Sequence, residues 1–133
     1  MKYFIFQGNN HDCGFASLKM LLASISHDKS YLYIPKVTKR EYFTVDELAN
    51  IANDYGVELG QFACDDDYFT KMQCPCITLI DSNHAVLVKK VTKRNITFYD
   101  PYNGRVKLKR ENFLKRWKLK VKDNGTTMPI SCN

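Results

Sequence analysis

Apolar residues recur at helical spacing twice in the first half of the chain. The first run begins at Cys13, with Asp12 in the position of an N-cap, and ends near Ser26. Its apolar positions, three or four residues apart, are Phe15, Leu18, Leu22 and Ile25. The second run follows Thr44–Glu47, which has the pattern of a capping box, and Gly56 marks its end. Both runs predict amphipathic helices.

Short runs of β-branched and aromatic residues replace the helical pattern in the second half. Turn residues separate four such runs, which predicts an antiparallel sheet of short strands. The four runs are 76–80, 85–91, 95–99 and 105–108. A last amphipathic run, 110–117, predicts a closing helix. Helices followed by an antiparallel sheet place the chain in the α+β class.

Weaker patterns lie between these elements. Residues 3–6 and 57–63 are apolar stretches that favour extended structure or a short strand. The acidic triplet at 65–67 favours the start of a short third helix, because acids stabilise a helix N-terminus. Residues 29–43 predict a loop or a short strand.

The chain has 133 residues, of which 44% are apolar, and this suits one globular domain. We place that domain at 1–122 and a polar tail at 123–133. No run of about eighteen apolar residues occurs, and residues 1–6 do not resemble a signal peptide. We therefore expect a cytoplasmic protein, or a cytoplasmic domain of a longer one.

Charge is unevenly distributed along the chain. Residues 1–88 carry 7 Lys and Arg against 11 Asp and Glu, whereas 89–133 carry 13 against 3. A basic C-terminal third favours an acidic partner, such as a nucleic acid, an anionic membrane or an acidic peptide. A solvated face of ordinary lysines explains the same charge equally well. The aromatic residues of this stretch fit core positions better than base stacking, so we expect no specific nucleic-acid partner.

The five cysteines are an odd number, which favours reduced thiols over a secreted disulfide framework. Cys74 and Cys76, with Cys64, suggest a zinc site. However, Cys-x-Cys is shorter than the usual ligand spacing, and no second pair completes a set. We therefore expect no metal and no cofactor. Cys76 opens an apolar strand, which favours a buried thiol.

Cys13 differs from the other cysteines because it begins a predicted helix. The positive end of a helix dipole favours the thiolate, which is the nucleophilic form. Gln7, six residues earlier, offers an amide that could donate to an oxyanion formed beside the sulfur. Taken alone, a cysteine at such a position is more often a small buried apolar residue.

A thiol nucleophile needs a base and a group that orients the base. His27 lies roughly 20 Å farther along the same helix, and pairing His11 with Cys13 would require a sharp fold of the backbone. His84 lies at the start of a predicted strand, and Asp100 ends the next one. Two antiparallel strands joined by a short turn bring these two positions side by side.

The ordered set of Gln7, Cys13, His84 and Asp100 resembles the bacteriocin-processing, double-glycine leader cysteine peptidases. These are papain-like domains usually found at the cytosolic N-terminus of peptide-exporting ABC transporters. The matching segments are QGNNHDCGFASLKMLL, NHAVLVKKV and TFYDPYNGRVKLKRENFLKRW. The chain departs from the family pattern at Phe43–Val45, where a glycine is usual, and at Cys74–Cys76, where the family is proline-rich and apolar.

The resemblance implies a papain-like fold in which Cys13 is the nucleophile and His84 the general base and acid. Asp100 would orient the histidine, and Gln7 would donate to the oxyanion. The reaction would remove leader peptides after a Gly-Gly or Gly-Ala pair from bacteriocin or signalling-peptide precursors, coupled to export. The partners would be the leader peptide and the membrane and nucleotide-binding parts of an ABC transporter.

Two other functions remain open at this stage. Some members of the family lack the cysteine and only hold the substrate for export, although Cys13 argues against this non-catalytic binding function here. A thiol amidase with another substrate would use the same three residues.

Overall fold

The computed structural model describes residues 2–8, 11–36, 43–60, 74–81 and 83–118. Its helices are α1 (Cys13–Ser26), the 3-10 helix η1 (Lys29–Tyr33), α2 (Val45–Asp54) and α4 (Arg110–Lys118). Its strands are β1 (Cys76–Ile80), β2 (His84–Val91), β3 (Asn95–Asp100) and β4 (Gly104–Lys109). Helices therefore precede an antiparallel sheet, and the α+β prediction is confirmed.

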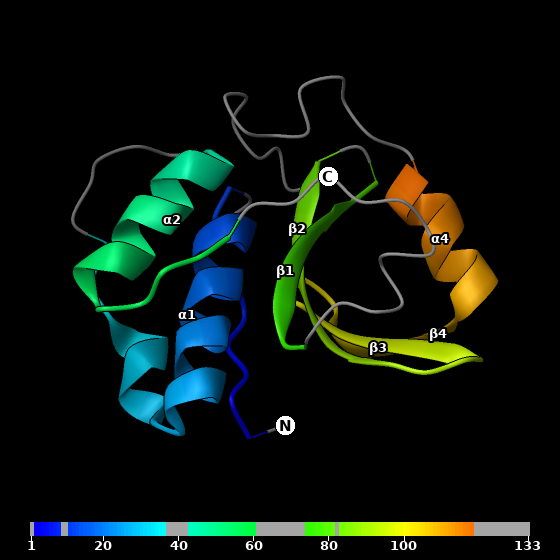
Figure 1. The fold of residues 1–133 in the computed structure, drawn as a ribbon, viewed down its shortest axis with the longest axis horizontal. Helices are drawn as coiled ribbons and strands as arrows, with labels where there is room; N and C mark the ends of the chain where they lie inside the picture. Colours follow the sequence, from blue (N-terminus) through cyan, green and yellow to red (C-terminus); the bar gives the residue numbers. More distant parts are fainter. Residues whose placement is uncertain (1, 9–10, 37–42, 61–73, 82, 119–133) are drawn as a thin grey trace.

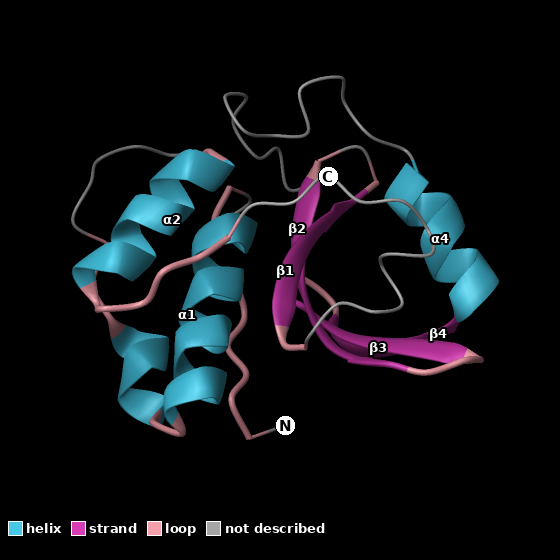
Figure 2. Ribbon diagram, in the orientation of Figure 1, coloured by secondary structure: helices cyan, strands magenta, loops and turns pink. Residues whose placement is uncertain are grey.

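The helices cover both faces of the sheet. Figure 1 shows α1 between α2 and the sheet, with α4 on the opposite side. The strand order is β1-β2-β3-β4, and every neighbouring pair is antiparallel. Figure 2 shows the sheet bending between the β1–β2 pair and the β3–β4 pair. The pairing of β2 with β3 shifts between Val88 and Lys90, and such a bulge increases the local bend and twist of a strand.

Two layers of apolar side chains hold the sheet to its helices. The cluster under α4 consists of Ile80, Val86, Val88, Ile96, Phe98, Phe113 and Trp117. On the other face, Leu87 and Tyr99 pack with residues of α1 such as Met20 and Leu21. Because alternate strand residues point to opposite faces and helices cover both faces, β2 and β3 are buried along most of their length.

Local sequence signals explain where the two N-terminal helices end or begin. His27 follows α1 in the left-handed conformation, with φ 52°, and its N–H donates to the carbonyl of Ala23. At the start of α2, the Thr44 hydroxyl accepts from the N–H of Glu47, and the Glu47 carboxylate accepts from the N–H of Thr44. The predicted capping box is confirmed.

Four weaker predictions need correction or fall outside the described residues. Residues 29–33 form η1 rather than a loop or strand, because Asp28 caps it by accepting from the N–H of Ser30 at 2.9 Å. Residues 57–60 have no regular structure, so the predicted strand there is wrong, and 61–63 lie outside the described residues. The helix predicted from 65–67 and the tail at 123–133 also lie outside them.

We expect Thr44→Ala to lower the free energy of unfolding by about 1 kcal/mol, because it removes the side-chain acceptor of the capping box. Urea unfolding followed by circular dichroism measures the change. Asn50→Ala, at an exposed position of the same helix, is the matched control. Equal stability of the two variants would contradict this account of how α2 begins.

No helix within the described ranges is long and apolar enough to cross a membrane.

Candidate active site

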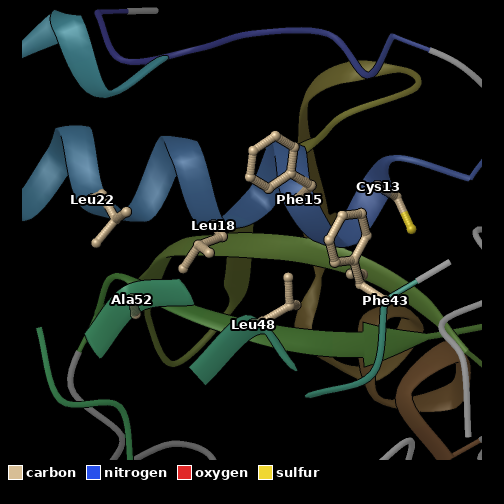
Figure 3. Close-up of a cluster of buried hydrophobic side chains, with 8 residues drawn as sticks. Cys13, Phe15, Leu18, Leu22, Phe43, Leu48 and Ala52 are labelled. Carbon is tan, nitrogen blue, oxygen red and sulfur yellow. The ribbon is translucent and has the colours of Figure 1, made fainter. Parts of the chain in front are cut away.

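Cys13 is the first residue of α1, as the helical pattern predicts. Its side chain is fully buried in a cluster that includes Phe15, Phe43 and Ala85. Figure 3 shows Cys13 at the start of α1, with Phe15 and Phe43 beside it. Ala85 directly follows His84 in β2, so this cluster holds the start of α1 against the start of β2.

The sulfur of Cys13 is disulfide-bonded, while Cys74 and Cys76 are free thiols. Only the thiolate of a reduced cysteine is nucleophilic. Nucleophilic chemistry at Cys13 accordingly requires the reduced protein, and assays of it need a thiol reductant.

His84 and Asp100 form a buried hydrogen-bonded pair. Nε2 of His84 lies 2.9 Å from Oδ1 of Asp100, and the two residues are 3% and 1% exposed. His84 begins β2 and Asp100 ends β3, so the contact predicted from the strand order is confirmed. Among the described residues, no hydrogen-bond partner reaches Nδ1 of His84. With Nε2 turned to the carboxylate, Nδ1 is the ring nitrogen that can exchange a proton with a nucleophile.

The turn after β3 fixes the Asp100 carboxylate. Its Oδ1 accepts from the backbone N–H of Tyr102 at 2.8 Å, and its Oδ2 accepts from the side-chain amide of Asn103 at 3.0 Å. Burial raises the pKa of Asp100, but the hydrogen bonds from His84, Tyr102 and Asn103 and the charge of His84 outweigh it and lower the pKa to about 2. Sequence reasoning missed Asn103, although an Asp followed by a Pro-x-Asn turn is a signal for such a side-chain contact.

The lowered pKa of Asp100 predicts a contribution to stability that depends on pH. The folded protein favours the carboxylate, so this contribution is present above the ordinary pKa of 3.8 and is lost as the pH falls toward about 2. We expect the free energy of unfolding of Asp100→Asn to fall less than that of the wild type between pH 4 and 2. Urea titrations at several pH values measure it, and parallel declines would contradict the prediction.

Gln7 lies beside the residues that flank this pair. Its backbone N–H donates to the carbonyl of Pro101 at 2.9 Å, which ties the N-terminal segment to the turn after Asp100. On the other side, a Cβ placed on Gly8 would lie 3.2 Å from the Asp12 carboxylate, so the 7–8 segment also packs against the start of α1. The half-buried Gln7 is therefore held between the two elements that carry the thiol and the carboxylate.

Two other residues named in the sequence analysis, His27 and Asp12, make different contacts. His27 is exposed after the last turn of α1, where its ring contacts the edge of Tyr3 at 6.4 Å. Asp12 occupies the N-cap position, but its side chain makes no cap bond and instead pairs with Lys36 at 3.4 Å.

The thiols of Cys74 and Cys76 correct one expectation. Both are half-exposed, so the prediction that Cys76 is a buried thiol is wrong. No group of three His, Cys, Asp or Glu side chains in the described ranges could hold a metal ion.

Papain-like cysteine peptidases combine a helical layer with an antiparallel sheet, and the chain has this arrangement. Residues 1–122 match the Peptidase C39 family. The chain belongs to that family, which is a family of cysteine peptidases.

Two relatives extend this comparison. The chain is 28% identical over 120 residues to the lacticin-481/lactococcin-DR transport/processing ATP-binding protein lcnDR3 of Lactococcus lactis subsp. lactis. That match covers 85% of this chain and 17% of lcnDR3, so the chain spans about a sixth of its relative's length. A crystal structure of a double glycine motif protease from an AMS/PCAT transporter, in complex with the leader peptide, has a TM-score of 0.71 and 25% identity. It covers 86% of this chain and 84% of that one.

Proposed function

We propose that the chain is a cysteine endopeptidase that removes leader peptides after a double-glycine-type motif, Gly-Gly or Gly-Ala, during peptide export. Cys13 is the nucleophile, His84 the general base and acid, Asp100 the group that orients His84, and Gln7 the oxyanion donor. The observation that carries the proposal is the buried 2.9 Å contact between His84 and Asp100. His84 begins β2, and the next residue, Ala85, packs in the same cluster as Cys13. The family and both relatives support it.

The proposed reaction follows from the order of these groups. Nδ1 of His84 takes the proton of the Cys13 thiol, and the thiolate attacks the carbonyl carbon of the scissile bond. The amide of Gln7 donates to the oxyanion that forms. Protonated His84 then gives its proton to the leaving amine, which leaves the leader's carboxyl group as a thioester on Cys13. His84 next activates water, which hydrolyses the thioester and restores the thiol.

Asp100 contributes because it is an anion throughout this cycle. Its pKa of about 2 keeps the carboxylate ionised at any pH at which the peptidase works. An ionised carboxylate beside Nε2 fixes the ring orientation and stabilises the imidazolium that forms when Cys13 loses its proton.

The proposed substrate and location rest on the relatives. One is a transport/processing protein, and the other is a protease bound to its leader peptide. A pair of small residues directly before the scissile bond suits a site built close to a fully buried Cys13, because a narrow cleft rejects bulky side chains. We place the domain at the cytoplasmic face of the membrane, acting with the membrane and nucleotide-binding parts of an ABC transporter.

Synthetic leader–core peptides test the substrate. Peptides ending their leaders in Gly-Gly, Gly-Ala or Val-Val are incubated with the reduced protein, and mass spectrometry identifies the products. We expect cleavage directly after the first two motifs and none after Val-Val. Cleavage of all three, or of none while a small thioester or amide substrate turns over, would instead support a thiol amidase. Binding of the leader without turnover of any substrate would support the non-catalytic function.

A further inference from the structure

Cys74 and Cys76 form a pair of neighbouring free thiols. The chain bends at residues 74–75, just before β1 begins at Cys76. Both side chains pack against the apolar cluster under α4, so the two sulfurs, two residues apart, lie on the same side of the segment. Both thiols are half-exposed and neither is in a disulfide. Cysteines two residues apart in a chain have Cα atoms within the range that a disulfide can bridge.

The surroundings of Cys74 favour its thiolate. The hydrogen bond from Cys76 is the largest effect, burial opposes it, and the ammonium group of Lys89 and the N–H of Val91 add to it, so that the pKa of Cys74 is lowered to about 7. Reactive cysteines lie in such positively charged, partly exposed places. A thiol whose pKa is near the ambient pH is the most effective attacking group in thiol–disulfide exchange.

This pair is separate from the candidate active site. Cys76 pairs with Val88 in the sheet, whereas His84 pairs with Ile80 at the other end of the same two strands. The positive charge of Lys89 interacts with Cys74. The Lys89 ammonium group also donates a hydrogen bond to the hydroxyl of Ser24, near the end of α1, at 3.2 Å. The peptidase mechanism assigns no role to Cys74, Cys76 or Lys89.

We propose that Cys74 and Cys76 are a redox-active dithiol that exchanges with small-molecule disulfides. The Cys74 thiolate attacks one sulfur of the small disulfide, forms a mixed disulfide and releases one small thiol. The Cys76 thiol then loses its proton and attacks the Cys74 sulfur, which releases the second small thiol. The protein loses two hydrogens and gains a Cys74–Cys76 bond, and the small disulfide is reduced to two thiols.

Peptide mapping of the full chain tests this exchange. Trypsin releases residues 72–89 as one peptide that holds Cys74 and Cys76 and no other cysteine. The protein is equilibrated in glutathione buffers of rising oxidised fraction, quenched with acid and alkylated. We expect this peptide to lose the mass of two hydrogens and to become resistant to alkylation at both sulfurs. A peptide that stays doubly alkylated in excess oxidised glutathione would overturn the proposal.

Variants separate the roles of the two thiols. In Cys76→Ser the resolving thiol is absent, so we expect glutathione to remain attached to Cys74, whereas in Cys74→Ser the rate of adduct formation should fall about tenfold. Lys89→Gln should slow the first step at neutral pH by about threefold, with Lys90→Gln as the matched control on the same strand. If the wild type also stops at a glutathione adduct, or if Cys76 reacts first, the assignment is wrong.

Discussion

We expect Cys13→Ala to reduce leader cleavage by about 10⁴-fold or more, the largest effect of any single substitution in the chain. The sulfur is the only atom of that side chain that can form the thioester, and no neighbouring group replaces it. The change removes a single small atom from a fully buried position, so the fold and the surface that binds the leader stay in place. Cleavage is followed by mass spectrometry under reducing conditions.

Cys74→Ala is the matched control for Cys13→Ala, because it removes a thiol from a half-exposed position outside the site. We expect it to cleave at the wild-type rate. The Cys13→Ala protein should still bind a fluorescent leader peptide with an affinity close to that of the wild type. Retention of cleavage by Cys13→Ala would show that the nucleophile is a different residue.

Asp100→Asn is expected to lower kcat by about 10²–10⁴-fold with little change in leader affinity. The asparagine keeps the size of the side chain and can still accept from the N–H of Tyr102. However, a neutral amide no longer stabilises the imidazolium of His84, and it can present an N–H where the ring requires an acceptor. Asp54→Asn, at the exposed end of α2, is the matched control.

The pH dependence of kcat distinguishes loss of the interaction between Asp100 and His84 from loss of the folded structure. Asp100, whose pKa is about 2, stays a carboxylate over the pH range of the assay and contributes no step of its own to the wild-type profile. Loss of the carboxylate should shift the low-pH decline to lower pH, because the negative charge beside Nε2 favours the protonated ring. An unchanged profile with wild-type kcat would mean that Asp100 does not act through His84.

The positions of the candidate site residues could be predicted from the sequence because short-range patterns determine them. Helical periodicity placed Cys13 at the start of α1, and the capping box placed α2. The short β2–β3 connection left one antiparallel arrangement that brings His84 and Asp100 together, and the structure has it.

The incorrect predictions concern features whose structure depends on tertiary contacts. The 3-10 helix η1 is capped by the Asp28 side chain, which accepts from the N–H of Ser30. The mixed composition of residues 29–43 does not predict this hydrogen bond. The strand expected at 57–63 has no partner in the described sheet, and an apolar stretch alone does not make a strand. The exposure of Cys76 follows from the position of β1 at the edge of the sheet, which the apolar run of that strand could not indicate.

Covalent labelling by a leader peptide that ends in Gly-Gly chloromethyl ketone tests the central claim most directly. The reagent places an electrophilic carbon next to the position of the scissile carbonyl, and only a correctly placed thiol reacts quickly. The tryptic peptide 3–19 holds Cys13 and no other cysteine. We predict one adduct per reduced chain, on that peptide, with slower labelling in Asp100→Asn and in a reagent that ends in Val-Val. Adducts on the peptide 72–89, or equal labelling by a chloromethyl ketone without the leader, would contradict the account.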